Sequence, residues 1–151
     1  MPDPSEYDFE KLAREIVTAR LKDIQDAPTA AAEIADKIIV SGVQSTRVRQ
    51  DPRLTVTGAC RGVMSGMLII EKDLNATALA LINSMAHLAQ EIHTDPADMM
   101  TWCMAGIAPV VMMGHPDLKS AIREAIEERF MGAGEIFGQL CEKAEKSGAG
   151  S

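Results

Sequence analysis

Aromatic residues are scarce in this chain of 151 residues, which contains three Phe, one Tyr and one Trp. Aromatic and β-branched side chains favour strands, so their scarcity argues against a sheet. Methionine occurs ten times and Ala, Leu and Ile are abundant, which favours helices. The length fits one domain with a core of its own. We therefore expect a single all-α domain over 1–146, followed by a flexible Gly/Ser tail over 147–151.

Paired cysteines are also missing. Cys60, Cys103 and Cys141 are an odd, widely spaced set without a CxxC motif, which indicates neither a disulfide framework nor a zinc site. We interpret all three as reduced, buried side chains. The N-terminal residues are rich in acids and contain no apolar run, so no signal or transit peptide is indicated. These features predict a cytoplasmic protein.

Positive charge is in deficit, because the net charge is −7. Such a molecule repels nucleic acid and anionic membranes, so we do not expect nucleic acid as a partner. Four arginines gather over 45–61 against one Asp: Arg47, Arg49, Arg53 and Arg61. One interpretation is an anion site built by these arginines. The other is a solvated loop with a structural ion pair, and the scattered spacing favours it.

Helix start signals recur along the chain. Asp51-Pro52 and Asp95-Pro96 each place an N-cap acceptor before a proline at the first helical position, and His115-Pro116 continues the series. Together with apolar spacing in steps of three and four, these signals predict helices over 5–25, 29–43, 52–72, 76–93, 96–114 and 116–146. Two glycines in the last of them, at 132 and 134, predict a kink or break there.

Formal charge is absent from two long stretches, Leu74 to Gln90 and Met99 to Pro116. A helix that is apolar all round must be buried. We expect a bundle-like or orthogonal arrangement of about six helices, with a central apolar hairpin over 76–114 wrapped by the amphipathic first, second and last helices. Both stretches are shorter than the ~20 residues of a membrane span, and acids flank them, so no span is predicted.

A second copy of the chain would help to cover this hairpin. Two inner helices are hard to bury fully in a domain of this size, so we predict a homodimer. Gly58, Gly62 and Gly66 form a GxxxGxxxG stripe within one helix. Such a stripe permits close approach of two helices. It favours a tight crossing within the fold or across a subunit interface, and the spacing leaves both alternatives open.

Three residues are candidates for a ligand site. Arg61 is flanked by apolar and small residues, and a buried Arg needs an acid or anion as a partner. His87 shares a helix face with Glu91, but no Glu-x-x-His pattern is present, so we predict no metal and no cofactor. Trp102 lies in the Met-rich segment, which is either core or an adaptable pocket. An apolar pocket near Arg61, His87 and Trp102 would suit a small molecule.

Catalytic motifs are absent from the sequence: it contains no nucleophile elbow, phosphate loop or dinucleotide glycine pattern. We therefore expect a non-enzymatic helical protein that acts through self-association and partner binding, as an adaptor, regulator or scaffold. The alternative is a small-molecule-binding helical bundle, or an enzyme, that uses the apolar pocket.

Overall fold

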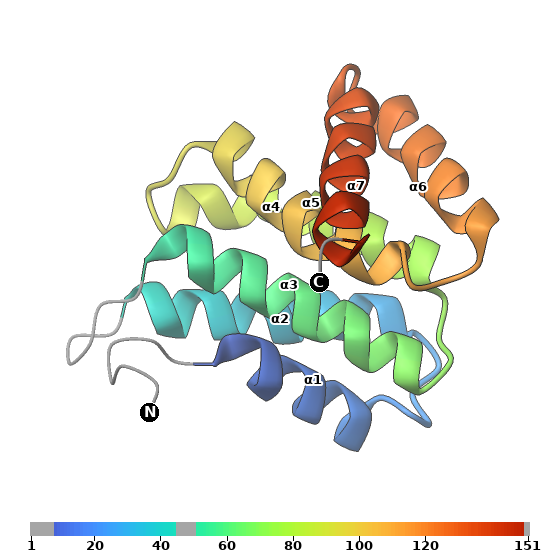
Figure 1. The fold of residues 1–151 in the computed structure, drawn as a ribbon. Coiled ribbons are helices and arrows are strands. Elements are labelled where there is room, and N and C mark those ends of the chain that lie inside the picture. The colour runs from blue at the N-terminus through green and yellow to red at the C-terminus, as the bar shows by residue number, and fades with distance from the viewer. Residues whose placement is uncertain (1–7, 45–50, 150–151) are drawn as a thin grey trace.

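The computed structural model describes residues 8–44 and 51–149. In these ranges the chain forms helices and no strand, which confirms the predicted all-α class, although the helices number seven rather than six. Their order in Figure 1 is α1 (Phe9–Arg20), α2 (Ala27–Val43), α3 (Pro52–Ile69), α4 (Leu74–Glu91), α5 (Pro96–Val111), α6 (Pro116–Arg129) and α7 (Ala133–Ala149).

Aspartate side chains cap the N-termini of the first five helices, where each accepts a hydrogen bond from a backbone N–H group of the first turn. Two helices begin two residues earlier than predicted. The cap of α2 is Asp26, which accepts from the backbone N–H of Thr29 at 3.4 Å. The cap of α4 is Asp73, which accepts from the backbone N–H of Ala76 at 3.0 Å.

The predicted helix over 116–146 is two helices, because the chain turns between α6 and α7. Gly132 has a φ of +92°, a conformation that glycine adopts without steric cost. Glu127 holds the turn: its Oε2 accepts from the N–H of Gly132 at 2.6 Å and its Oε1 from the N–H of Gly134 at 3.2 Å. At its other end α7 continues to Ala149, into the segment predicted as a flexible tail.

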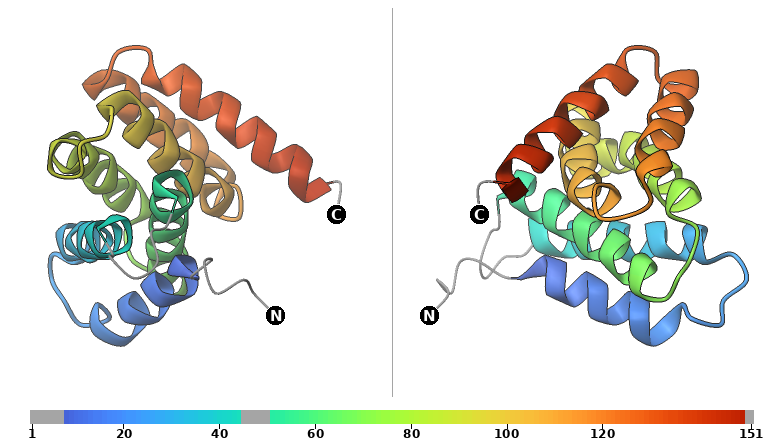
Figure 2. Two further views of the ribbon diagram at one scale, coloured as in Figure 1. Left: turned by 90° about the vertical axis from the view of Figure 1, so that its left-hand side faces the viewer. Right: turned by 45° about the vertical axis from the view of Figure 1, so that its right-hand side comes forward.

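The centre of the fold is α3, which packs between α1 and α5 and also contacts α2 and α4. The apolar hairpin is α4 and α5, where α5 is covered by α3, α4 and α7 and α4 by α2 and α5. In Figures 1 and 2 α7 crosses over α5, and α6 lies beside α7 at the edge of the molecule. The hairpin is thus sheltered by α3, α2, α6 and α7, whereas α1 packs mainly on α3 and does not wrap the hairpin as predicted.

Candidate functional site

A groove of about 740 Å³ opens between α3, α5 and α7, and we call it the α5 groove. This volume falls in the range of small-molecule sites in proteins. Its lining comprises Arg61 from α3, Ala105 and Pro109 from α5 with Met112 and Met113 just beyond the end of that helix, and Leu140, Lys143, Ala144, Glu145 and Ser147 from α7.

The floor of the α5 groove is apolar because of residue spacing on α5. Ala105, Pro109 and Met112 follow one another at intervals of four and three residues, so they share one face of the helix. All three are half-buried, whereas Ile107 and Ala108 between them are buried in the core. The floor therefore carries no charge and remains partly open to solvent.

The α7 wall of the groove follows from how this helix meets α5. Phe137 and Cys141 lie one turn apart on the inner face of α7 and are fully buried. Burial raises the pKa of the Cys141 thiol to about 11, so the thiol stays protonated and unreactive. Leu140 and Ala144 are half-buried beside them and face the groove. In the left view of Figure 2 the C-terminal half of α7 extends away from the other helices.

Arg61 reaches the rim of the α5 groove from α3. Its apolar neighbours in sequence predicted a buried arginine, but 50% of its side chain is exposed. The reason is its position at the edge of the α1–α3 contact, where the aliphatic stem lies beside the helices and the guanidinium reaches water. Its Nε donates to Oε1 of Glu10 on α1 at 2.9 Å. An exposed ion pair of this kind adds little stability.

The other two predicted ligand residues do not line this groove. His87 is exposed near the C-terminal end of α4, a helix that contributes nothing to the lining. Trp102 is half-buried one turn before Ala105 on α5, and its carbonyl accepts a hydrogen bond from the hydroxyl of Thr57 at 3.3 Å. Of the predicted trio, only Arg61 lies at the groove.

The predicted anion site is only partly described. Arg47 and Arg49 lie outside the described residues. Arg53 is exposed in the first turn of α3, and its backbone N–H donates to Asp51 at 2.9 Å. Arg53 and Arg61 are eight residues apart, about 12 Å along a helix. The backbone positions of these two arginines are therefore well separated along α3, and the anion site stays a prediction.

The glycine stripe lies against α1 within the same chain. A Cβ atom at Gly62 would overlap the carbonyl oxygen of Glu10, and one at Gly66 would lie 2.7 Å from Cγ1 of Val17. Gly58 has more room, because its nearest atoms would be 3.5 Å away. The glycine face of α3 is thus occupied by α1. A fourth glycine that the sequence analysis did not single out, Gly106 of α5, approaches the carbonyl of Thr57 on α3 as closely.

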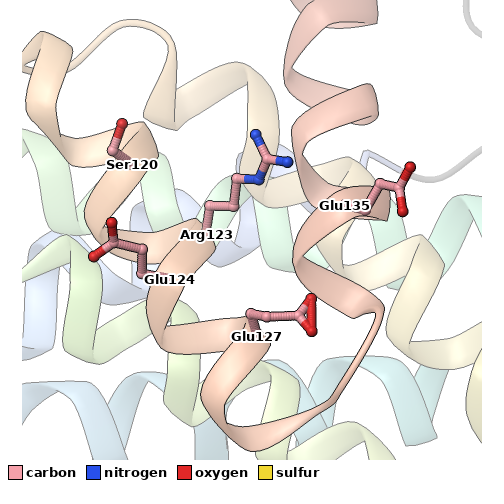
Figure 3. A pocket seen from close by; sticks show the side chains of 5 residues that line it. All are labelled: Ser120, Arg123, Glu124, Glu127 and Glu135. Carbon is pink, nitrogen blue, oxygen red and sulfur yellow. The ribbon is translucent and has the colours of Figure 1, made fainter.

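A second hollow, of about 500 Å³, lies between α6 and α7 and is shown in Figure 3. We call it the α6–α7 face, and it is lined by Ser120, Arg123, Glu124, Glu127 and Glu135. The guanidinium of Arg123 points toward α7, where Gly138 leaves room for it. Glu127 already accepts from two backbone N–H groups, and the other charged side chains here, Arg123, Glu124 and Glu135, are exposed and of both signs.

A third hollow, of about 310 Å³, lies beside Asp36 between α2 and α4. Oδ2 of Asp36 accepts from the hydroxyl of Ser84 at 2.6 Å, whereas its Oδ1 is buried without a hydrogen-bond partner. Burial raises the pKa of this carboxyl, and Glu91 and Glu33 raise it further, against the lowering effects of Ser84 and His87. The sequence analysis missed this residue, since an aspartate in an amphipathic helix normally faces water.

Neither a metal-binding cluster nor a membrane-crossing helix is found within residues 8–44 and 51–149. No group of three or more His, Cys, Asp or Glu side chains there could hold a metal ion. No helix there has both the length and the apolar character that crossing a membrane requires. Comparison of the chain with models of protein families, with curated proteins and with solved structures finds no match.

Proposed function

We propose that this chain is a non-enzymatic binding protein that takes an apolar small molecule in the α5 groove. The observation that carries the proposal is the uncharged floor on α5, which other helices leave half-covered although its neighbours Ile107, Ala108 and Val110 on that helix are buried. A ligand that covered this floor would gain about 25 cal/mol for each Å² of apolar surface removed from water. Met112 and Met113 adapt readily to different ligand shapes.

The test uses Nile red, a neutral apolar dye whose fluorescence rises in apolar surroundings. We expect saturable binding to the wild-type protein. Ala144→Glu places a charge and added bulk in the groove and should abolish binding, because Glu is compatible with the helix but not with an apolar pocket. The matched control is Ile136→Glu on the same helix, outside the groove lining, which should bind the dye like wild type. Equal binding by all three proteins would contradict the proposal.

Self-association is the second candidate, as a homodimer formed through the α6–α7 face. Two apolar side chains near this face are uncovered: Met131 is 96% exposed and Ile136 is 41% exposed. Arg123 makes no ion pair within the described part of the chain, and acids lie beside it. A two-fold interface must be self-complementary, and a face with both signs of charge meets that need.

In this second candidate the protein is an adaptor, regulator or scaffold of the cytoplasm, a location suggested by three unpaired cysteines. Light scattering at micromolar concentration should give twice the monomer mass. Ile136→Glu should give the monomer mass while leaving Nile red binding intact. Ala144→Glu should keep the dimer mass but lose Nile red binding. A wild-type monomer at this concentration would eliminate the homodimer without affecting the ligand proposal.

A further inference from the structure

The charged residues of the α5 groove distinguish it from a merely apolar hollow. Among the described residues that line it, Arg61 from α3 and Lys143 from α7 are accompanied by a single acid, Glu145. Cations thus outnumber acids in this groove, although the molecule as a whole carries a net charge of −7. Charge complementarity therefore favours an anionic group here and not a cationic one.

Both cations remain available to a ligand. The ion pair of Arg61 with Glu10 uses Nε, and a guanidinium has five N–H donors, so donors remain on the Nη atoms. Lys143 is exposed, and no salt bridge engages it within the described part of the chain. An ion pair between exposed groups is weak, so an anion competes with Glu10 at little cost.

The cations and the apolar floor belong to one site but come from different elements. Floor residues lie along α5, and the two cations stand on the helices at either side of it. A ligand that satisfied both features would have an aliphatic part and an ionised end. We propose that the α5 groove binds a single-chain amphiphile with an anionic head, of the class of fatty carboxylates. The chain lies along Ala105, Pro109 and Met112, and the carboxylate lies between Arg61 and Lys143. This inference rests on the proposed ligand-binding function.

The experiment compares decanoate with decanol, which has the same chain and no charge, by calorimetric titration at about pH 8, where a carboxyl group is ionised. Decanoate should bind with a stoichiometry of one and more tightly than decanol. Arg61→Gln and Lys143→Gln should each weaken decanoate binding about tenfold, the low end for loss of a charge-assisted hydrogen bond, and leave decanol binding unchanged. Glu145→Gln should strengthen decanoate binding.

The matched control is Lys146→Gln, an exposed lysine of the same helix that does not line the groove, and it should bind decanoate like wild type. Circular dichroism of each variant checks that the helices are retained. Equal affinities for decanoate and decanol, or decanoate binding unaffected by both cation variants, would overturn the anionic head while leaving an apolar site. If neither decanol nor Nile red binds to the protein, the proposed function is overturned as well. Loss of a dimer on adding decanoate would assign the groove to a second copy and overturn the inference.

Discussion

The two sides of the helical core are packed in opposite ways. On one side α1 and α3 approach so closely that the carbonyl of Glu10 occupies the place of a side chain at Gly62. On the other side α7 meets α5 only through its inner face, and the α5 groove remains. Each helical glycine costs about 1 kcal/mol relative to alanine, a cost offset only where backbones come into contact. The comparison suggests that glycines fix one side of α3 while methionines leave the far side of α5 adaptable.

The largest effect is expected from adding one methyl group at the tight crossing of α1 and α3. Gly62→Ala should lower the free energy of unfolding by about 2 kcal/mol or more, because the new Cβ overlaps the backbone of α1 and the two helices must separate. The measurement is urea unfolding followed by circular dichroism.

Gly58→Ala is the matched control for that crossing, since its new Cβ would meet atoms at ordinary contact distance, 3.5 Å. This variant should be unchanged or more stable by up to about 1 kcal/mol, owing to helix propensity. Equal losses in the two variants would show that helix geometry, not the approach of α1, sets the cost.

A smaller effect is expected where α7 is held in place. Glu127→Ala removes the acceptor of two backbone N–H groups, those of Gly132 and Gly134, and should cost about 1–2 kcal/mol, as loss of a helix cap does. Glu128→Ala, an exposed neighbour, should change stability by less than about 0.5 kcal/mol. Because the turn aims α7 over α5, we also expect Glu127→Ala to weaken Nile red binding. Retention of full stability would mean that the turn does not depend on this cap.

The sequence predicted the fold class because the relevant signals are local. Asp-Pro pairs mark helix starts, and the starts at Pro52 and Pro96 are found where they were predicted. Asp26 and Asp73 were missed as caps because Thr29 and Asn75, which are N-cap residue types themselves, lie at the predicted helix starts of 29 and 76. The break in the last predicted helix was expected near its glycines. The conformation of the turn depends on Glu127, and the sequence does not reveal this role because Glu127 meets these N–H groups only once the chain has turned.

The candidate site could be predicted only in part, because the groove is formed by several helices and the sequence does not state how they lie relative to one another. The spacing of Gly62 and Gly66 indicated a close approach, yet nothing in it identified α1 as the partner. Arg61 was singled out as a candidate site residue and does line the α5 groove, but it was predicted to be buried, since its apolar neighbours in sequence do not reveal which helix edge it occupies. Leu140 and Lys143 were assigned no role in a binding site, because their part in the groove depends on where the turn at Gly132 directs α7.

The smallest expected effect concerns Asp36, which lies neither at the tight crossing nor at the groove. Its pKa is raised in the folded protein, chiefly by burial, from an ordinary value of 3.8. The folded state therefore holds this proton more tightly than the unfolded state, and the resulting stabilisation is full below that value and lost as the pH rises through the folded pKa. When this carboxyl group is ionised, its buried Oδ1 has no hydrogen-bond partner to stabilise the charge.

Asp36→Asn removes this charge while keeping an oxygen that accepts from the hydroxyl of Ser84. The variant should be more stable than wild type at pH 7 by about 1 kcal/mol, because it no longer has to hold a charge in a partly buried place. The difference should shrink as the pH falls toward the ordinary carboxyl value, because both proteins are then neutral at this position. Urea unfolding of both proteins across this pH range gives the comparison, in which the other carboxyl groups cancel. A difference that did not vary with pH would mean that the carboxylate of Asp36 is adequately solvated between α2 and α4, and that packing rather than charge sets the effect of the substitution.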